Sequence, residues 1–509
     1  MTARTLMVQG TASSVGKSLI VAGLCRMLRQ DGYRVAPFKA QNMALNAYVT
    51  PDGREIGRAQ AAQAEAAGVA PTVEMNPILL KPEGDSRSQV VVLGKSIGSM
   101  AAVEYHQKKP EMRHVVLESL ARLRRDFEVV VIEGAGSPAE INLRDRDIVN
   151  MHVARIAEAP VLLVGDIDRG GVFAAFVGTM DLLEPDDRAR VAAFIVNKFR
   201  GDLTLLQPGL DFIERRTGVP VLGVVPYIPR LRLADEDSLS LEARRHRRAA
   251  RSDELEIAVV CLPRISNFDD FEPLEHEPGV LVRFVDRPEA AASADLVILP
   301  GSKSTIADLG WLHESGIADV IQERARRLAP VLGICGGCQM LTERIDDSEQ
   351  VESTLQTGAA GLGLLTARTR FGRDKTTARV VAHATGPSFF AADVARDSPL
   401  RGYEIHMGQI EISGPDVLAF DVRERNGRAE SAADGAVGFG GAVVGTMIHG
   451  LFENDSFRAG VLRALRRRKG LAEPALTGAI KTREEEYDRL ARVLRESLDA
   501  DRLHGIVGL

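Results

Sequence analysis

The sequence has few cysteines, few aromatic residues and no long apolar run. Its 509 residues include four cysteines and one tryptophan. Four cysteines are too few for a disulfide framework in a chain of this size, which excludes the small disulfide-rich folds. No apolar stretch approaches the roughly 18 residues of a membrane span, and a signal-peptide pattern does not precede the first strand. These absences predict a cytoplasmic protein with no membrane partner.

A strong excess of charge of one sign is also absent. The formal net charge is −6, and basic and acidic residues are interspersed along the chain. Such a composition gives no electrostatic footprint for nucleic acid or an anionic membrane, so small-molecule partners are favoured. At about 150 residues per domain, the length predicts two to four structural units.

A glycine-rich loop stands near the start of the chain, between a short apolar strand at 5–9 and a helical pattern at 19–28. Backbone N–H groups at a helix start can cradle phosphate oxygens, so this order predicts a P-loop that binds ATP. The loop is one residue longer than the usual motif, and in this it resembles dethiobiotin synthetase. A Gly/Ser-rich turn with a chance lysine is the alternative. The expected ligands of the nucleotide are Gly10, Thr11, Gly16, Lys17 and Ser18, with the Ser18 hydroxyl also binding Mg²⁺.

Two charged residues follow other apolar strands of this half. Lys39 follows a strand at 35–38, and Glu133 ends a strand at 129–133. Since nucleotides bind at the carboxyl edge of such sheets, Lys39 is expected to be a second phosphate cation and Glu133 a second Mg²⁺ ligand. A solvated surface lysine and a helix N-cap acid are the alternatives.

Further strands are predicted at 160–164, 191–196 and 220–226, separated by helical patterns, which indicates a parallel sheet with right-handed crossovers. Asn197 follows the second of these strands and is expected to recognise the adenine base. Acidic groups near the same edge could position Mg²⁺ or the amine nucleophile, or form a salt-bridged surface. The sequence does not decide among Asp145, Asp147, Asp166 and Asp168.

Polar residues gather in turn-rich sequence at 41–46, 55–60 and 76–82 rather than on an apolar helix face. We expect them to hydrogen-bond a large polar ligand, and simple solvation is the alternative. A charged linker is predicted at 234–254, after a first domain at 1–233. Its basic run at 244–248 has no interleaved aromatic residue, so a solvated tether is favoured over nucleic-acid binding.

The second half opens a new α/β pattern, with a domain expected at 255–455. At its centre a strand enters Gly-Ile-Cys-Gly-Gly and leaves in a helix, which places Cys335 on a sharp turn at a helix N-terminus. Such a position exposes the sulfur and favours its thiolate, as a nucleophile requires. Cys335 and Cys338 also have the spacing of a redox pair, but the flanking glycines are better explained by a nucleophile elbow, and Cys338 can pack as a small apolar residue.

A thiolate nucleophile needs a base, and two histidines follow strand-like runs. His449 lies just after an apolar strand and before a glycine, so it is the expected catalytic base. His406 is expected to line the pocket or to have a structural role. Class I glutaminases carry an acid two positions beyond this histidine, where this chain has Leu451. The imidazole could be oriented by Glu453, Glu404, a carbonyl, or no ionised group.

Residues 456–509 show a helical, charged pattern, and we expect this C-terminal extension to pack against the glutaminase-like domain through an apolar stripe. The stripe consists of Leu490, Val493, Leu494 and Leu498.

These motifs, in this order, resemble the cobyric acid synthase family, the glutamine-dependent amidoligases of cobalamin biosynthesis. The similarity runs from about Leu6 to Glu453 and includes the P-loop, the segments at 41–46, 133–143 and 166–171, the Cys335 elbow, 402–408 and 449–452. It implies a P-loop domain like that of dethiobiotin synthetase followed by a class I glutaminase-like α/β domain. The family's catalytic cysteine and histidine correspond to Cys335 and His449, and its branch of glutaminases lacks the usual third triad residue.

The resemblance implies a corrinoid substrate, adenosylcobyrinic acid a,c-diamide, amidated at its b, d, e and g carboxylates with ATP and glutamine. Each acid would be activated by phosphorylation and then attacked by ammonia from glutamine. Cobyrinic acid a,c-diamide synthase, which uses the same chemistry on earlier carboxylates, is the nearest alternative. A MinD-like ATPase fused to a non-catalytic glutamine-binding module is an alternative of another class.

Overall fold

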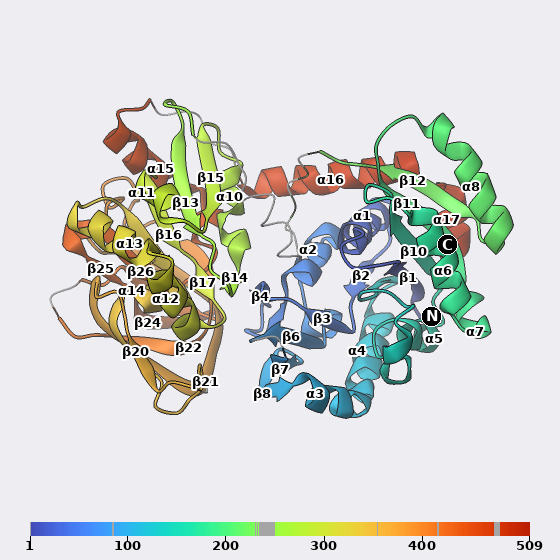
Figure 1. The fold of residues 1–509 in the computed structure, drawn as a ribbon, viewed down its shortest axis with the longest axis horizontal. Coiled ribbons are helices and arrows are strands. Elements are labelled where there is room, and N and C mark those ends of the chain that lie inside the picture. The colour runs from blue at the N-terminus through green and yellow to red at the C-terminus, as the bar shows by residue number, and fades with distance from the viewer. Residues whose placement is uncertain are drawn as a thin grey trace. The chain divides into compact units, whose positions relative to one another are not determined.

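The computed structural model describes residues 2–83, 86–229, 231, 233, 250–353, 355–414, 417–472 and 479–509. The basic run at 244–248 and most of the expected linker lie outside the described residues. The chain divides into two compact units (Figure 1). Unit 1 comprises Met1–Ala44, Ile56–Glu236 and Arg483–Leu509, and unit 2 comprises Leu45–Glu55 and Asp237–Thr482.

Unit 1 is built on a parallel sheet, as the alternation of strands and helices predicts. In spatial order its strands are β12 (Val221–Pro226), β11 (Val191–Phe199), β10 (Val161–Asp166), β1 (Arg4–Gly10), β9 (Val129–Glu133) and β2 (Val35–Phe38). Apolar side chains alternate between its faces, so that Leu6 and Val8 enter one core and Met7 the other. Burial on both faces explains why these strands read as continuous apolar runs.

Helices cover both faces of this sheet, and a smaller sheet lies in the same unit. The helices are α1 (Lys17–Gln30), α2 (Arg58–Ala67), α3 (Ala102–Lys108), α4 (Arg113–Asp126), α5 (Met151–Ala157), α6 (Val172–Leu182), α7 (Pro185–Arg188) and α8 (Leu203–Thr217). Short 3-10 turns are η1 (Val73–Met75), η2 (Lys109–Met112) and η3 (Ile141–Arg146). The smaller sheet consists of β3 (Gln41–Met43), β6 (Ile78–Pro82), β7 (Arg87–Val92) and β8 (Lys95–Ala101).

The C-terminal helices α16 (Ala479–Ser497) and α17 (Ala500–Val507) pack on unit 1. Leu494 lies so close to Gly23 of α1 that a Cβ at Gly23 would stand 2.3 Å from its Cδ1. Arg26 of α1 also bonds Asp488 at 2.7 Å. The expectation that this stripe packs on the glutaminase-like half is therefore wrong, because α1 presents a small residue and a buried cation that match the helix.

Unit 2 is built on a second sheet, parallel except at one edge. Its strands are β15 (Val280–Val285), β13 (Leu255–Val260), β16 (Leu296–Leu299), β18 (Val331–Ile334), β26 (Val443–Thr446) and the antiparallel edge strand β25 (Ala436–Gly438). Helices and turns around it are η4 (Phe268–Phe271), α10 (Glu272–Glu275), α11 (Pro288–Ala292), α12 (Thr305–Glu314), α13 (Ile317–Arg326), α14 (Gly336–Leu341), η5 (Phe439–Gly441), η6 (Leu451–Glu453) and α15 (Asp455–Lys469). The short strands β14 (Ile265–Ser266) and β17 (Gly301–Ser302) pair with each other.

A long, mostly antiparallel sheet completes unit 2. It contains β20 (Gly358–Ala360), β19 (Thr342–Asp346), β21 (Leu365–Ala384), β22 (Leu400–Ile412), β23 (Phe420–Arg425) and β24 (Arg428–Asp434). The small two-stranded sheet of β4 (Ala47–Val49) and β5 (Glu55–Gly57) contacts it, and β4 lies against β21 and β22. Thus a hairpin from the first sixth of the sequence folds with the second unit.

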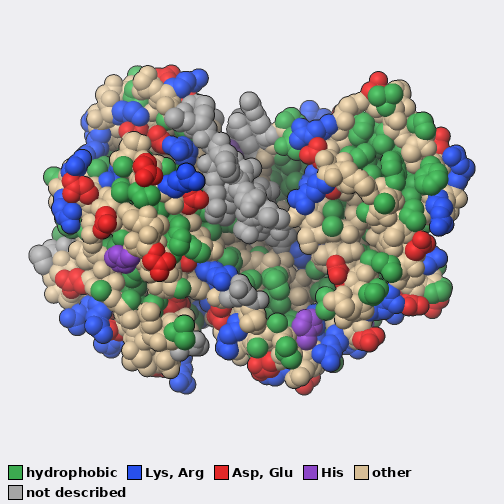
Figure 2. Space-filling model, in the orientation of Figure 1, with side chains coloured by type: hydrophobic (Ala, Val, Ile, Leu, Met, Phe, Trp, Pro, Cys, Tyr) green, Lys and Arg blue, Asp and Glu red, His purple; other side chains and the backbone are tan. Residues whose placement is uncertain are grey.

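The surface carries both signs of charge. On the face drawn in Figure 2, basic and acidic side chains intermingle over each unit. Within the described residues, no helix combines the length and apolar character needed to cross a membrane.

Candidate active sites

The glycine-rich loop joins the carboxyl end of β1 to the start of α1, as expected. Gly16 has φ +101°, a conformation that side chains rarely adopt, and a Cβ there would lie 2.3 Å from the Asn197 side chain. At Gly10 a Cβ would lie 2.6 Å from Val15. Glycine is therefore needed at both positions for the loop to close over the helix N-terminus. The Thr11 N–H donates to Val164 O at 2.9 Å, which ties the loop to β10.

Lys17 and Ser18 begin α1, immediately after the loop. The Lys17 ammonium donates to Ala12 O at 3.0 Å and to Gly136 O at 3.1 Å, so it lies between the loop and the turn after β9. The Ser18 hydroxyl donates to Glu133 Oε1 at 2.8 Å. Residues 115 positions apart are thus brought together at one sheet edge, as the strand-end argument predicts.

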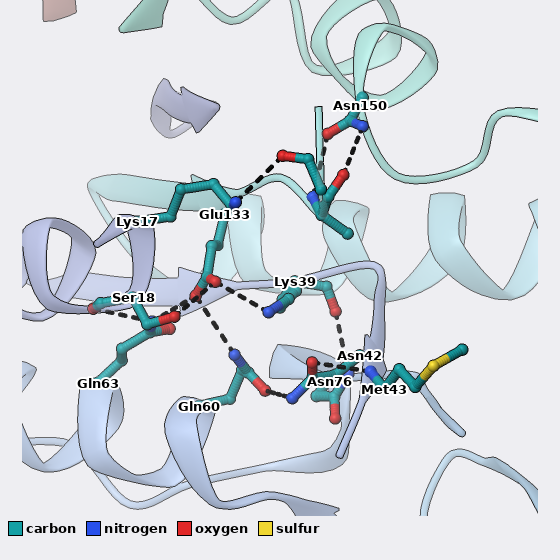
Figure 3. Close-up of polar contacts among 12 residues, drawn as sticks. Lys17, Ser18, Lys39, Asn42, Met43, Gln60, Gln63, Asn76, Glu133 and Asn150 are labelled. Carbon is teal, nitrogen blue, oxygen red and sulfur yellow. Dashed lines mark hydrogen bonds and ion pairs between the residues drawn. The ribbon is translucent and has the colours of Figure 1, made fainter. Parts of the chain in front are cut away.

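Glu133 is the centre of a buried polar network, shown in Figure 3. Its side chain is 1% exposed, and its Oε1 also accepts from the Lys39 ammonium at 2.8 Å. The Gln63 amide donates to its other oxygen at 2.6 Å. Lys39 is buried rather than a solvated surface lysine, and its charge balances the carboxylate.

Asn197 and the neighbouring Lys198 support the loop from β11. The Asn197 amide donates to Val15 O at 2.8 Å, and the Lys198 ammonium donates to Ser14 O at 2.7 Å. Lys198 also pairs with Asp166 at 2.8 Å. The role of Asn197 in reading the base remains a prediction, and the structure adds a contact that shapes the loop.

The candidate acids of this edge have different surroundings. Asp147 accepts from the backbone N–H groups of Val149, Asn150 and His152, so it fixes the turn that leads into α5. Asp168 pairs with Arg200 at 2.9 Å on the surface. Asp166 pairs with Lys198, whose ammonium also donates to Ser14 O of the glycine-rich loop.

Amide side chains of the predicted polar segments bond within unit 1. Asn42 donates to Gln60 at 2.9 Å, and Gln60 lies 3.5 Å from Glu133. Asn76 accepts from Gly57 N–H at 3.0 Å and donates to Ile78 O at 2.9 Å. These amides brace the turns around Glu133, which the sequence did not indicate, and their contact with a ligand remains a prediction.

Cys335 lies at the expected elbow between β18 and α14. Its φ and ψ are 51° and −111°, a strained conformation for a residue with a side chain. A Cβ at Gly336 would lie 2.7 Å from Ser302 N, and one at Gly337 would lie 2.0 Å from Leu299 O. The glycines therefore permit the close approach of β16 and β17 to the elbow, where backbone N–H groups of Gly336 and Ser302 can face an oxyanion.

His449 follows β26 and is 1% exposed. Its Nδ1 lies 2.6 Å from Oδ2 of Asp270, whose Oδ1 accepts from Gly450 N–H at 2.9 Å. Cys335 is a further polar neighbour of the imidazole. A cysteine, a histidine and a carboxylate in this order form the arrangement of a nucleophile, its base and the group that orients the base.

The surroundings make His449 a stronger base than a free histidine. Burial lowers the pKa of the imidazole, but the charge and hydrogen bond of Asp270, together with Cys335, outweigh burial and raise it to about 10. The ring is held further by Tyr403, whose ring stacks on it at 5.2 Å between centroids and 15° between planes. Backbone bonds join the same two residues in both directions.

The other candidates around this site have structural contacts. The Nδ1–H of His406 donates to Gly408 O at 2.7 Å, and burial lowers the pKa of the imidazole to about 4, so it is neutral at physiological pH. Glu404 pairs with Arg425 at 3.0 Å. Cys338 is fully buried, with its sulfur against Gly445, and burial raises its pKa well above the usual range. These contacts agree with a packing role for Cys338.

The sequence reasoning did not single out Asp270 and did not include it among the residues that could orient His449. It lies 179 positions before the histidine, in the turn η4 that follows β14. The available signal was its place after the first strand of the domain, at the carboxyl edge where the cysteine elbow also lies.

Two family models match this chain. The CobQ/CobB/MinD/ParA nucleotide binding domain matches residues 6–241, and the CobB/CobQ-like glutamine amidotransferase domain matches residues 256–457. The molecule therefore joins a nucleotide-binding domain to a glutamine amidotransferase domain, which confirms the predicted fold class. 

Relatives of the same length narrow this class. The cobyric acid synthase of Sorangium cellulosum (strain So ce56) is 63% identical over 518 residues, covering 100% of this chain and 99% of the relative. That of Salmonella heidelberg (strain SL476) is 52% identical, covering 99% and 98%, and that of Desulforamulus reducens is 50% identical, covering 100% and 98%. The chain belongs to the cobyric acid synthase family.

Proposed function

We propose that this protein amidates the b, d, e and g carboxylates of adenosylcobyrinic acid a,c-diamide, using ATP and glutamine, in cobalamin biosynthesis. The observation that carries the proposal is the 63% identity to a cobyric acid synthase along the whole chain. Such a function requires two chemistries, the activation of a carboxylate and the release of ammonia. We infer a cytoplasmic location from the small polar substrates.

The first chemistry belongs to unit 1. A carboxylate cannot expel oxide, so it must first accept a phosphoryl group from ATP. The loop N–H groups and Lys17 would bind the phosphates, and Lys39 would neutralise charge on the transferring group. The resulting acyl phosphate has a good leaving group, which ammonia can displace.

A magnesium ion fits the oxygen donors of this site. The Ser18 hydroxyl and the Glu133 carboxylate lie 2.8 Å apart at the helix start, and a small hard cation prefers a few such oxygens together with phosphate and water. Ser18 and Glu133 would hold the ion, which would supply charge neutralisation for the β- and γ-phosphates when bound. Lys39 would keep Glu133 oriented.

The second chemistry belongs to unit 2. Cys335 would attack the side-chain amide of glutamine, while His449 takes the thiol proton and returns it to the departing ammonia. The N–H groups of Gly336 and Ser302 would stabilise the oxyanion. Water would then hydrolyse the thioester, which releases glutamate and regenerates the Cys335 thiol. Asp270 would keep the imidazole in the orientation and tautomer that this exchange requires.

Ammonia released into bulk water would be protonated and lost as a nucleophile. We therefore propose that it reaches the acyl phosphate without exchanging with solvent. A measurable consequence is that glutamine-driven amidation should exclude external labelled ammonia from the product.

Incubation of the protein with the a,c-diamide, ATP and amide-labelled glutamine tests the function. We expect label in each of the newly formed amides, counted by mass, and no product without ATP. If the protein amidates cobyrinic acid rather than its a,c-diamide, the result would instead indicate a cobyrinic acid a,c-diamide synthase. Hydrolysis of ATP and glutamine with no corrinoid product would contradict the proposal.

A further inference from the structure

The hairpin Leu45–Glu55 belongs by sequence to the nucleotide-binding half but folds with unit 2. It lies within the stretch 6–241 that matches the nucleotide binding domain, whereas its contacts place it with the glutamine amidotransferase half. Its two ends run directly into β3 and α2, whose Asn42 and Gln60 bond to each other near Glu133. The hairpin is thus a covalent extension of the residues around the P-loop.

Specific contacts hold the hairpin on unit 2. Glu55 forms a buried ion pair with Lys375 of β21, with side-chain exposures of 1% and 12%. Tyr48 accepts a hydrogen bond at its hydroxyl from Arg379 at 3.0 Å. At the hairpin turn Gly53 has φ +78°, and the Asn426 side chain stands where a Cβ would project. Because an ion pair this buried is costly to break, the hairpin is a fixed part of the unit.

One arm of the hairpin reaches the catalytic imidazole through an amide. The Ala47 N–H donates to Asn267 Oδ1 at 2.9 Å, and Asn267 Nδ2 lies 3.4 Å from His449 Nε2. Asn267 is 3% exposed and has a left-handed backbone, with φ 52°. Since Ala47 offers a donor, the amide oxygen must face Ala47 and the NH₂ must face the imidazole.

The next residue of the same strand, Tyr48, leads to the face of the imidazole ring. The Tyr48 ring lies 6.1 Å from the Tyr403 ring, and Tyr403 stacks on His449. The hairpin therefore contacts Asn267 and Tyr403, two of the residues that surround the imidazole. 

From this geometry we propose that the hairpin supplied by the nucleotide-binding half positions the glutaminase histidine, with Asn267 and Tyr403 as its intermediaries. Asn267 is a positioning residue. Its NH₂ favours an unprotonated Nε2, whereas Asp270 favours the imidazolium, and the balance between the two suits a group that must both take and return a proton. This inference rests on the proposed role of Cys335 and His449 in glutamine hydrolysis.

The first test uses two substitutions of Asn267 in the full-length protein. N267G removes the side chain but keeps a residue that tolerates the left-handed backbone. We expect its kcat for glutamine hydrolysis to fall about 10- to 100-fold, with KM changed less than about threefold, because the reacting nitrogen is displaced rather than the substrate. N267D keeps an acceptor for Ala47 and presents a carboxylate to Nε2. We expect it to move the alkaline limb of the glutaminase pH profile to higher pH.

The second test changes the hairpin itself. Y48A removes the ring against Tyr403, while the matched control Y48F keeps the ring and loses the hydroxyl that accepts from Arg379. We expect Y48A to lower glutaminase kcat and Y48F to stay within about twofold of the native protein. Amidation driven by ammonia serves as the reference in every variant, because it does not need His449.

The outcomes separate the two proposals. Loss of glutaminase kcat in N267G and Y48A with ammonia-driven amidation retained supports the positioning role. Native glutaminase kinetics in both variants, or an equal loss of both activities, overturns it while leaving the proposed function intact. Absence of ammonia-driven amidation in the native protein would instead refute the proposed function.

Discussion

The Asp270 carboxylate lies 2.6 Å from the Nδ1 atom of His449, although the two residues are 179 positions apart. By this contact Asp270 is placed to orient the imidazole, as class I glutaminases do with an acid two positions beyond the histidine, where this chain has Leu451. Gly450 N–H donates to the other carboxylate oxygen, so the acid is held at both oxygens. Because both carboxylate oxygens are held, the acid fixes the orientation and the tautomer of the His449 imidazole.

Replacement of Asp270 should therefore impair glutamine hydrolysis selectively. D270N removes the carboxylate charge, the largest of the contributions that oppose burial, so the pKa of His449 should fall from its raised value of about 10. The imidazolium then loses its proton at a lower pH, so the alkaline limb of the glutaminase pH profile moves to lower pH. We expect kcat to drop about 100-fold or more, while ammonia-driven amidation is retained.

Glu404 provides the matched comparison, since sequence reasoning also proposed it for this role. Its carboxylate pairs with Arg425 instead. E404Q should leave the alkaline limb where it is in the native protein. A displaced limb in E404Q together with an unchanged one in D270N would contradict the assignment of Asp270.

Local patterns in the sequence predicted much of the two sites. Gly10 to Ser18 and the elbow at Cys335 are each a strand, a turn and a helix within about a dozen residues, so spacing and glycine chemistry suffice to place them. Lys39 and Glu133 required one further step, the rule that parallel strands present their carboxyl ends at one edge.

The remaining features depend on contacts between distant segments. Asp270 meets His449, Ala47 meets Asn267 over 220 positions, and Leu494 meets Gly23. An apolar stripe such as that of α16 shows that a helix is buried but not which surface covers it. Which distant segments pack together depends on the shape and charge of both surfaces. The periodicity of one segment gives no information about the surface of its partner.

Cys335 and Cys338 should respond differently to substitution. C335A removes the proposed nucleophile, so glutamine-driven amidation should disappear while ammonia-driven amidation persists. C338A removes only a sulfur that packs on Gly445. It should retain glutaminase activity and lose about 1 kcal/mol of stability or somewhat more. Product formation with each nitrogen source measures the first effect, and thermal unfolding measures the second. Glutamine-driven turnover in C335A would remove this residue from the mechanism.

Lys17 should be needed whichever nitrogen source is used, because its ammonium lies between the loop and the turn that follows Glu133. K17A should lower ATP-dependent amidation about 100- to 1,000-fold with glutamine or with ammonia, as expected for loss of a cation that stabilises phosphoryl transfer. The exposed Lys95 of β8 provides the control, and K95A should leave both rates unchanged. Equal rates in K17A and K95A would show that Lys17 takes no part in carboxylate activation.

Asp434 should make the stability of unit 2 depend on pH. Burial raises the pKa of its carboxyl to about 7, although hydrogen bonds from Thr446 and Met447 N–H oppose the shift. A carboxyl with a raised folded pKa binds protons more readily than in the unfolded chain. Its destabilising contribution therefore grows as the pH rises from the ordinary pKa of 3.8 to about 7, stays constant above that pH, and disappears below the ordinary pKa. D434N keeps an acceptor for Met447 N–H and cannot ionise.

We therefore subtract the melting temperature of the native protein from that of D434N. This difference should be larger, in favour of D434N, at pH 8 than at pH 5.5. The corresponding free-energy difference is about 2 kcal/mol over this interval. The exposed Asp397 serves as the control for the loss of one carboxylate, in the variant D397N. Calorimetry of the three proteins at both pH values measures the effect. A constant difference between D434N and the native protein would mean that Asp434 stays ionised when buried, held by its hydrogen bonds to the segment that carries His449.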